Sequence, residues 1–459
     1  MAGSSRRKFL QQLGSSGLAL SAGSIMAFKE NDAIILPEQK IIGPNDKLRI
    51  ATIGMGIMGN SDTDTALKIP GVELAAACDL YTGRLERVKE KYGRHIYTTR
   101  DYREILEKKD IDAVIIATGD HWHARIAKDA MNKGKHVYCE KPMVHKIEEG
   151  LPVINVQQQT KKIMQIGSQS ISGSVFTKAR ALYLSGEIGK INCIEASNDR
   201  HSALGAWQYT MPTDISTETI DWDRYIASMP KEPFDAKKFF WWRNYKDFGT
   251  GVAGDLFVHL ITRVHMITGS RGPGKIFASG QTAYWKDGRD VPDVMTAILD
   301  YPDTKEHPAF QLTLRVNFCS GKGESSVTRI IGDEGVMELS RGLTVQHNIL
   351  SKAPGIGGWD ALNTYPQAMQ QNLLDAYDKK YSREDKQRPV KPDVSYKAPD
   401  GEDEHVLHFA NFFNAIRTDS SVYEDATFGF RAAAPCLACN DSYFEKKIIT
   451  WDAENMKVI

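Results

Sequence analysis

Apolar runs and amphipathic segments alternate regularly through the first third of the chain. Short apolar runs predict strands at 48–53, 72–78, 111–117, 135–139 and 162–166. Helical patterns between and after them fall at 60–69, 82–92, 101–107, 122–133 and 147–160. Strands that alternate with helices of this length are typical of βαβ units around a parallel sheet.

The pattern changes after about residue 170, where strand candidates become longer and more β-branched. They follow one another closely, as in an antiparallel sheet, and lie at 190–197, 276–284, 293–300, 309–318 and 327–332. Helical patterns return at 404–417 and 427–445. An insertion rich in Trp, Pro and Asp spans 201–250, and the segment 345–403 is interpreted as an extended excursion. The predicted fold class is therefore α/β, with more than one domain.

Composition and charge argue against several classes of function. The 58 Lys and Arg residues balance 58 Asp and Glu residues, whereas a nucleic-acid-binding protein would carry a basic excess. No apolar run approaches the ~20 residues that a membrane-spanning helix needs. Six cysteines in 459 residues are too few for a disulfide scaffold. Cys436 and Cys439 lie within a helical pattern, where packing of small side chains is favoured over a redox role.

A glycine-rich loop follows the first predicted strand. Its G-x-G-x-x-G pattern suits a tight turn, the close approach of a pyrophosphate, and close packing of helix on strand. Asp79 ends the second predicted strand, 20 residues after Gly59, where a carboxylate binds the adenosine ribose. The predicted cofactor is NAD, and Arg84 leaves NADP possible. The residues predicted to bind it here are Gly54, Met55, Gly56, Ile57, Met58, Gly59 and Asp79.

Two more polar loops follow buried strands. Thr118–His123 (T-G-D-H-W-H) comes after the strand that ends at Ala117, and Glu140-Lys-Pro142 comes after the strand that ends at Cys139. Both loops leave the carboxyl ends of parallel strands, where an open α/β sheet binds its ligands. The neighbouring Asp120, His121 and His123 lack a fourth metal ligand, so no metal site is predicted.

With these loops the chain resembles the glucose–fructose oxidoreductase, inositol dehydrogenase and rhizopine catabolism (Gfo/Idh/MocA) family over about 48–459. The motifs that carry the resemblance are Gly54–Gly59, Asp120–His123, Glu140–Pro142 and Asp255–His259. The family implies an NAD-binding Rossmann domain, expected over 48–168. It also implies a substrate-binding and oligomerisation α/β domain, expected over 169–459, with a large, open, mostly antiparallel sheet. A homodimer or homotetramer is therefore expected.

The resemblance also assigns roles to particular residues. Lys141 matches the catalytic lysine of the family, and its ammonium group can stabilise a developing alkoxide. Asp255 and His259 match a D-x-x-x-H pair. On a helix these positions share one face, so Asp255 is expected to orient the His259 imidazole, which acts as the general base. The resemblance places a further set beside the nicotinamide end of the cofactor: Thr118, His121, Trp122, His123, Glu140 and Lys141.

An aromatic cluster lies within the insertion, at Trp207, Trp241, Trp242 and Tyr245. Aromatic faces suit the apolar faces of sugar rings, and Arg243 can bind hydroxyl or carboxylate groups. Core packing is an equally good interpretation of the cluster. The residues predicted to bind the substrate are Lys141, Arg243, Tyr245, Asp255 and His259.

The N-terminus resembles a twin-arginine export signal. Arg6 and Arg7 precede Phe9-Leu10 and a mild apolar stretch that ends at Ala27. Residues 1–27 are therefore predicted to be a signal peptide, 28–47 a linker, and the mature protein periplasmic. Free nicotinamide cofactor is not expected outside the cytoplasm, so an exported enzyme should hold its cofactor tightly.

Three functions are compatible with these residues. The first is an NAD(P)-dependent oxidoreductase that acts on a sugar, polyol or glycoside. The alternative is a glycosidase or lyase that works through a transient 3-keto intermediate, as in the NAD-dependent glycosidases of family 109. The intact Glu140-Lys-Pro142 sequence favours the first, whereas export and a bound cofactor favour the second. A sugar sensor without activity is disfavoured because both Lys141 and His259 are present.

Overall fold

The computed structural model describes residues 47–459. The predicted signal peptide, and the predicted linker apart from Lys47, lie outside the described residues. None of the described helices is both long and apolar enough to cross a bilayer.

The first domain is built on a parallel sheet of six strands in the order β3-β2-β1-β4-β5-β6, with every neighbouring pair parallel. Its strands are β1 (Leu48–Ile53), β2 (Val72–Cys78), β3 (Tyr97–Thr99), β4 (Ala113–Ile116), β5 (His136–Glu140) and β6 (Met164–Gly167). Its helices are α2 (Ile57–Ala66), α3 (Thr82–Tyr92), α4 (Tyr102–Leu106), α5 (Asp120–Asn132) and α6 (Gly150–Thr160). This doubly wound order confirms the predicted Rossmann fold.

The second domain carries a sheet of ten strands in the order β14-β13-β12-β11-β7-β10-β9-β8-β15-β16. The strands β7 and β10 are parallel, and the other neighbouring pairs are antiparallel. The central strands are β7 (Ile191–Asp199), β8 (Lys275–Gln281), β9 (Val294–Tyr301), β10 (Phe310–Asn317) and β11 (Ser325–Gly332). Outside these lie β12 (Gly335–Leu339), β13 (Leu343–His347), β14 (Val394–Tyr396), β15 (Ile449–Asp452) and β16 (Lys457–Val458). The large, mostly antiparallel sheet is confirmed.

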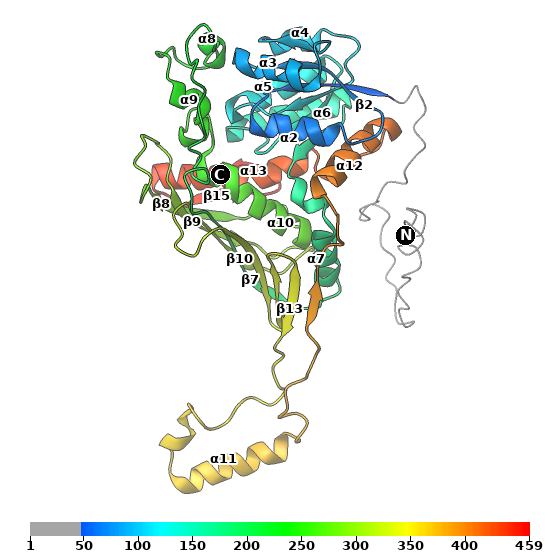
Figure 1. Ribbon diagram of the computed structural model, residues 1–459. Coiled ribbons are helices and arrows are strands. Elements are labelled where there is room, and N and C mark those ends of the chain that lie inside the picture. The colour runs from blue at the N-terminus through cyan, green and yellow to red at the C-terminus, as the bar shows by residue number, and fades with distance from the viewer. Residues whose placement is uncertain (1–46) are drawn as a thin grey trace, which may run out of the picture. The chain divides into compact units, whose positions relative to one another are not determined.

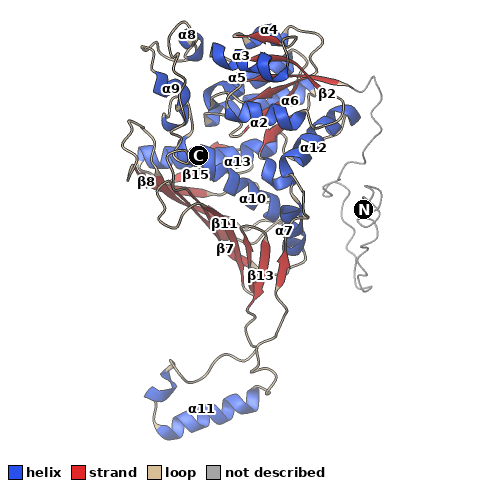
Figure 2. Ribbon diagram, viewed as in Figure 1, coloured by secondary structure: helices blue, strands red, loops and turns tan. Residues whose placement is uncertain are grey.

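One face of this sheet is buried and the other is open. Along β9, Met295, Ala297 and Leu299 are buried, whereas Thr296 and Ile298 between them are exposed. The buried face lies beneath α7 (Ser174–Leu184), α10 (Val258–Thr268) and α13 (Ala426–Glu445). Figure 2 shows these helices between the large sheet and the first domain. Cys436 and Cys439 lie inside α13 as free, buried thiols, in agreement with the packing role.

Two segments differ from the sequence-based expectation. The excursion between β13 and β14 contains a regular helix, α11 (Gln367–Lys380), drawn away from the sheets in Figure 1. Helix α12 (Glu404–Thr418) packs on the first sheet, where Phe409 stacks on Tyr138 with ring centres 4.2 Å apart. A parallel sheet must be covered on both faces, so the C-terminal part of the chain supplies this cover.

The insertion between β7 and β8 is joined to the first domain by backbone hydrogen bonds. The Thr82 N–H donates to the carbonyl of Thr219 (2.9 Å), and the Asp221 N–H donates to the carbonyl of Leu80 (3.0 Å). A second set of aromatic residues, the junction cluster, packs beneath these bonds and consists of Tyr81, Trp222, Tyr225, Phe239, Phe240, Tyr245 and Phe248. The insertion contains α8 (Trp222–Tyr225), α9 (Ala236–Phe240) and η5 (Trp242–Asn244).

Candidate active site

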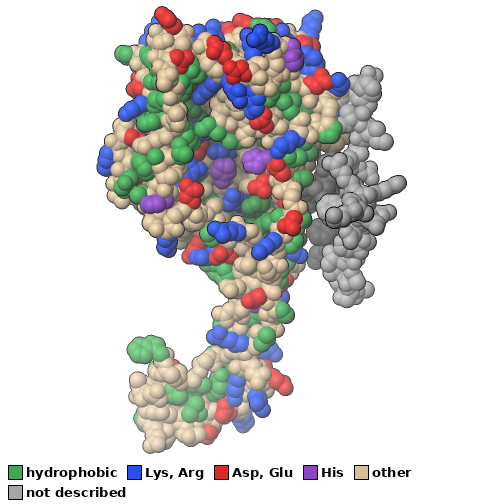
Figure 3. Space-filling model, viewed as in Figure 1, with side chains coloured by type: hydrophobic (Ala, Val, Ile, Leu, Met, Phe, Trp, Pro, Cys, Tyr) green, Lys and Arg blue, Asp and Glu red, His purple; other side chains and the backbone are tan. Residues whose placement is uncertain are grey.

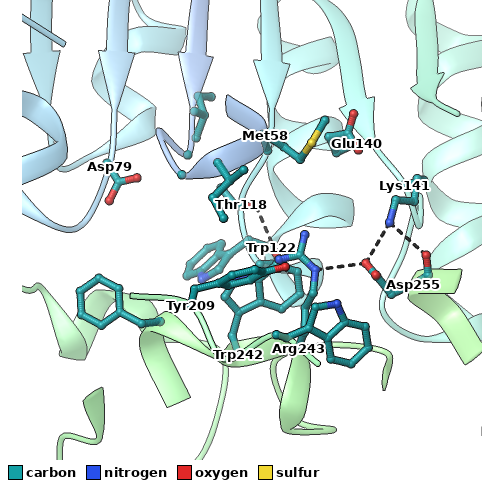
Figure 4. A pocket seen from close by; sticks show the side chains of 18 of the residues that line it. Met58, Asp79, Thr118, Trp122, Glu140, Lys141, Tyr209, Trp242, Arg243 and Asp255 are labelled. Atoms are coloured by element: carbon teal, nitrogen blue, oxygen red, sulfur yellow. Dashed lines mark hydrogen bonds and ion pairs between the residues drawn. The ribbon is translucent and has the colours of Figure 1, made fainter. Parts of the chain in front are cut away.

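A cavity of about 500 Å³ lies at the carboxyl ends of the parallel strands. Ile53, Cys78 and Glu140 line it from the ends of β1, β2 and β5, and Ala117 lines it directly after β4. The second domain supplies the opposite wall. Figure 3 shows the molecular surface in the same view as Figure 1. In Figure 4, Asp79 lies at one end, and Lys141 with Asp255 lies at the other.

The glycine loop has the geometry of a phosphate cradle. Gly54 has a φ of +92°, and a Cβ atom there would lie 2.5 Å from the carbonyl oxygen of Ala117. A Cβ atom on Gly59 would lie 1.8 Å from the carbonyl oxygen of Gly54, so only glycine permits this packing of helix on loop. Above Gly56 the space is open, and Arg84 is the nearest group, at 3.8 Å. The N-terminus of α2 therefore offers its free N–H groups and partial positive charge to an anion in the cavity.

Some residues of this loop line the cavity, and others belong to the core of the first domain. Gly54, Gly56, Ile57 and Met58 line the cavity. The Met55 side chain instead belongs to the hydrophobic core of the first domain, so the prediction that Met55 binds the cofactor is wrong for its side chain.

Asp79 lines the cavity from the end of β2. Its carboxylate accepts hydrogen bonds from the N–H groups of Met55 (2.7 Å) and Tyr81 (2.9 Å). Arg84 Nη1 lies 3.3 Å from the same carboxylate, and the Arg84 guanidinium group packs on the Phe240 ring, 5.6 Å from its centre. The residues present therefore fit the adenosine half of a dinucleotide, with a fixed carboxylate beside the ribose.

Lys141 and Asp255 meet at the other end, although 114 positions separate them. Lys141 Nζ donates to Asp255 Oδ1 (2.8 Å) and to the Asp255 carbonyl (3.0 Å), and Arg243 Nε donates to the same Oδ1 (3.1 Å). Burial by itself would raise the pKa of Asp255, but the adjacent Lys141 and Arg243 cations hold this pKa well below its usual value. The carboxylate is therefore ionised and fixes the directions of both cations (Figure 4).

His259 lines the cavity beside this group, but Asp255 does not hold it. Asp255 lies in a π-helical turn, η6 (Ala253–Phe257), and α10 begins only at Val258. The regular alignment of positions i and i+4 is lost there, and the Asp255 carboxylate binds Lys141 and Arg243 instead. The prediction that Asp255 orients the imidazole is therefore wrong. Burial, followed by the Lys141 and Arg263 charges, lowers the pKa of His259 well below 6.5, so the ring is neutral at pH 7.

His121 and His123 lie in the first turn of α5, where both side chains are buried and neither lines the cavity. His123 Nδ1 lies 2.8 Å from the Pro142 carbonyl, and its Nε2 lies 3.3 Å from the Thr118 carbonyl. It thereby joins the two polar loops. His121 lies between the carbonyls of Phe248 (3.1 Å) and Tyr225 (3.2 Å). Of the residues predicted in this loop, Thr118 and Trp122 line the cavity, whereas His121 and His123 do not.

The residues that line the end of the cavity near Lys141 also differ in part from the predicted substrate-binding residues. Arg243 and Trp242 line the cavity, with the guanidinium group 4.1 Å from the Trp242 ring centre. Tyr245 is buried among the aromatic residues of the insertion and does not line the cavity. The lining residues that were not predicted include Asn198, Arg200, Tyr209, Arg263, Ser326 and His405. Only Arg263 had a local signal, because it lies one helical turn after His259.

A buried acid lies directly behind Lys141. Burial raises the pKa of Glu140 to about 7, and its carboxyl accepts a hydrogen bond from Gln169 Nε2 (2.6 Å). Asp62 on α2 is fully buried nearby, and burial followed by the neighbouring Glu140 raises its pKa as well. The pair therefore favours a protonated state that an unfolded chain would not keep at neutral pH.

We expect the Glu140→Gln variant to be more stable than the wild type at pH 8 but not at pH 4.5. A raised pKa in the folded state means that ionisation destabilises the fold, and this cost grows from pH 4.5 to about 7. The expected gain is at most ~3 kcal/mol, since one pKa unit corresponds to about 1.4 kcal/mol. Denaturant unfolding at pH 4.5, 6 and 8 measures it, with Glu148→Gln as the exposed control. A difference that does not change with pH would contradict the expectation.

Fold and site together define a class of proteins: two-domain oxidoreductases whose first domain binds a dinucleotide and whose second domain completes the site. Residues 48–168 match the model of an oxidoreductase family with an NAD-binding Rossmann fold. Residues 226–338 match the GFO/IDH/MocA C-terminal domain. The chain belongs to the Gfo/Idh/MocA family. Among residues 47–459, no group of three His, Cys, Asp or Glu side chains is arranged to hold a metal ion.

Known relatives include both dehydrogenases and glycosidases. An alpha-N-acetylgalactosaminidase of Shewanella oneidensis is 34% identical over 173 residues, which cover 34% of this chain and 38% of that protein. An inositol 2-dehydrogenase of Salmonella paratyphi B is 31% identical over 145 residues, covering 31% of this chain and 43% of that protein. The chain thus matches only about two fifths of the length of these relatives. A structure of levoglucosan dehydrogenase with NADH and levoglucosan shares the fold, with a TM-score of 0.62 at 18% identity over 88% of this chain and 99% of that one.

Proposed function

We propose that the protein is an NAD-dependent oxidoreductase that acts on a CH–OH group of a sugar, polyol or glycoside. One observation carries the proposal: Lys141 from the first domain and His259 from the second line the same cavity as the glycine loop and Asp79. A cation and a neutral base at one end of a dinucleotide site are the two groups that alcohol oxidation needs. The fixed Asp79 carboxylate favours NAD over NADP, because it would repel a 2′-phosphate.

The roles of the side chains follow from their charge states. The neutral His259 ring accepts the proton of the substrate hydroxyl, and the Lys141 ammonium donates a hydrogen bond to the same oxygen and stabilises its developing negative charge. Asp255 keeps the ammonium in place, and His123 holds the loop that carries it. When bound, NAD⁺ supplies the hydride acceptor, so the alcohol leaves as a ketone or aldehyde.

The cofactor is expected to remain bound during purification. The insertion reaches over the adenosine end, where Phe239 and Phe240 line the cavity beside Arg84, and backbone bonds join it to the first domain. We expect about one NAD per chain to survive gel filtration, measured by absorbance and by mass after acid release. A preparation that is free of cofactor and has only millimolar affinity for NAD would contradict this.

A second candidate is a glycosidase that works by transient oxidation, and the match to the Shewanella alpha-N-acetylgalactosaminidase favours it. A ketone at C3 acidifies the neighbouring C–H, whose loss as a proton expels the aglycone. Water then adds to the enone and the ketone is reduced, so the net reaction is hydrolysis. Incubation with aryl glycosides separates the two functions. Aglycone release without net cofactor reduction supports the glycosidase, and accumulation of NADH with a keto sugar supports the oxidoreductase.

Two further features are part of the proposal. Export by the twin-arginine route to the periplasm rests on Arg6, Arg7 and the apolar stretch after them. Retention of an Arg6→Lys, Arg7→Lys double variant in the cytoplasm would support it, and unchanged export would refute it. A homodimer or homotetramer agrees with the open face of the large sheet, and light scattering measures the mass directly.

A further inference from the structure

Basic side chains gather around the substrate end of the cavity. The lining of the whole cavity contains seven Lys or Arg residues and three Asp or Glu residues. Arg84, Arg100 and Arg224 come from elements around the end where Asp79 lies. The other four are Lys141, Arg200, Arg243 and Arg263, which share the second end with Asp255 and the buried Glu140. A neutral sugar would not need so much positive charge.

Asp255 forms ion pairs with only two of these four cations. Lys141 and Arg243 both bind its Oδ1 atom. Arg200, which follows β7, donates through Nη1 to the carbonyl of Gly205 (2.9 Å) and lies 5.5 Å from the centre of the Phe318 ring. Within residues 47–459, no carboxylate lies within 4.0 Å of the Arg200 or Arg263 guanidinium group.

Of Arg200 and Arg263, Arg263 has the guanidinium group whose charge and N–H donors are less fully matched by neighbouring groups. Its Nη1 donates to Ser326 Oγ (2.9 Å), and its guanidinium group lies 5.4 Å from the centre of the Phe176 ring. Its Nε is buried and has no hydrogen-bond partner among the described atoms. Burial lowers the pKa of Arg263, opposed by the charge of Glu404, which is exposed. A buried guanidinium group without a nearby carboxylate is costly, and an anion in the cavity that Arg263 lines would offset its charge.

These guanidinium groups lie close to the reacting end of the cavity. Arg263 is on α10, one turn after His259. Arg263 and Arg200 both contribute, with Lys141, to lowering the pKa of His259. The phosphates of a dinucleotide have their own place at the glycine loop and the N-terminus of α2. Arg200 and Arg263 come from the second domain and are therefore available to the substrate.

We propose that the substrate is an anionic sugar, whose carboxylate, phosphate or sulfate group is bound by Arg200 and Arg263. The planar guanidinium fork matches the oxygens of all three groups, with two parallel N–H donors to one oxyanion. This inference rests on the proposed function, because it concerns the substrate of the same site. In this arrangement Lys141 and His259 act on the reacting hydroxyl. Arg200 and Arg263 bind the charged substituent of the same sugar.

The test compares matched sugars that differ in one charged substituent. The NAD-loaded enzyme is assayed with glucuronate against glucose, galacturonate against galactose, and glucose 6-phosphate and glucose 6-sulfate against glucose. The variants are Arg200→Gln, Arg263→Gln and Arg263→Lys, with Arg329→Gln as control. Arg329 is exposed on the open sheet, where it binds Glu338. KM and kcat are measured for each pair, and equilibrium binding is measured by calorimetry.

At least one anionic sugar is expected to have a KM at least tenfold lower than its neutral partner. Arg200→Gln and Arg263→Gln should each raise that KM about 10- to 100-fold, the usual size of a lost hydrogen bond to a charged group. They should raise the KM of the anionic sugar much more than they change kcat or the KM of the neutral partner, and Arg263→Lys should restore part of the loss. The anionic sugar with the lowest KM identifies the substituent.

Equal KM values for all charged and neutral pairs would overturn the inference. Binding of inorganic phosphate or sulfate as tightly as the sugar esters would also overturn it, because the arginines would then hold an anion without reading a sugar. If no sugar is oxidised at all, the proposed function fails separately, and calorimetry still decides the inference from the binding of charged against neutral sugars. Where Arg263→Gln does not fold, Arg200→Gln and the wild-type comparison give the same decision.

Discussion

Replacement of Lys141 by alanine should lower kcat by at least ~100-fold, the largest effect that we expect from a single substitution. Its ammonium group lies in a cavity where little water screens it, so its stabilisation of a developing alkoxide is strong. The substrate and cofactor are bound by other groups, and KM and the affinity for NAD should change much less than kcat. The measurement is steady-state turnover at saturating substrate, with bound NAD quantified for both proteins.

Two comparisons make this result specific. Lys146→Ala removes an exposed lysine five positions away and should leave turnover unchanged. Lys141→Arg keeps the charge but not the compact shape of the ammonium group, and should recover only part of the activity. Turnover of Lys141→Ala within threefold of the wild type would remove this residue from the mechanism.

Replacement of His259 by alanine should also cost about 100-fold or more in kcat/KM, the usual contribution of a positioned general base. The ring acts only when neutral, and burial followed by the charges of Lys141 and Arg263 holds its pKa well below 6.5. The wild-type profile of kcat/KM should therefore be flat with respect to this group above pH 6.5 and fall only in more acidic solution. The alanine variant should lose that acid limb.

The pH profile distinguishes a base from a structural residue. A variant that only disturbed packing would lower the rate at every pH and keep the shape of the profile. His95→Ala, at an exposed position of the first domain, should keep both rate and shape. An acid limb that survives unchanged in the His259→Ala variant would assign the proton transfer to another group.

The Lys141 and His259 variants test a step that both candidate functions share. Both should lower net oxidation and hydrolysis alike, because each reaction begins by removing a hydroxyl proton and a hydride. The Arg200 and Arg263 variants should instead change which sugar is bound. A catalytic pair and a binding pair would thus differ in which kinetic constant they alter.

Much of the cofactor-binding part of the site could be predicted, because its residues belong to short motifs at the ends of predicted strands. Gly59 is required by a contact within a single strand-turn-helix unit, because its Cβ atom would collide with the Gly54 carbonyl. Gly54 has a positive φ in the turn of the same unit. Asp79 follows from its position at the end of β2. The loop that carries Lys141 follows from the strand before it, because the carboxyl ends of parallel strands share one edge of a sheet.

The roles that could not be predicted depend on contacts between distant segments. Asp255 was paired with His259 by helical spacing, but a π-helical turn and two cations from elsewhere in the fold directed it to Lys141 and Arg243. His121, His123 and Tyr245 looked like ligand-binding residues in the sequence. His121 and Tyr245 are buried because the insertion packs aromatic residues against the first domain. His123 is buried between the carbonyls of Pro142 and Thr118 within the first domain.

The sequence by itself thus determined the alternation of strands and helices, the dinucleotide loop and the presence of a lysine and a histidine suited to proton transfer. These features are encoded by periodicity and by short motifs, which act over a few residues. Only the tertiary structure decided that α12 covers the first sheet, that Asp255 binds Lys141, and that Arg200 and Arg263 line the same cavity. The physical reason is that burial, charge and hydrogen-bond partners are set by neighbours in space, and here those neighbours lie up to hundreds of positions apart in the chain.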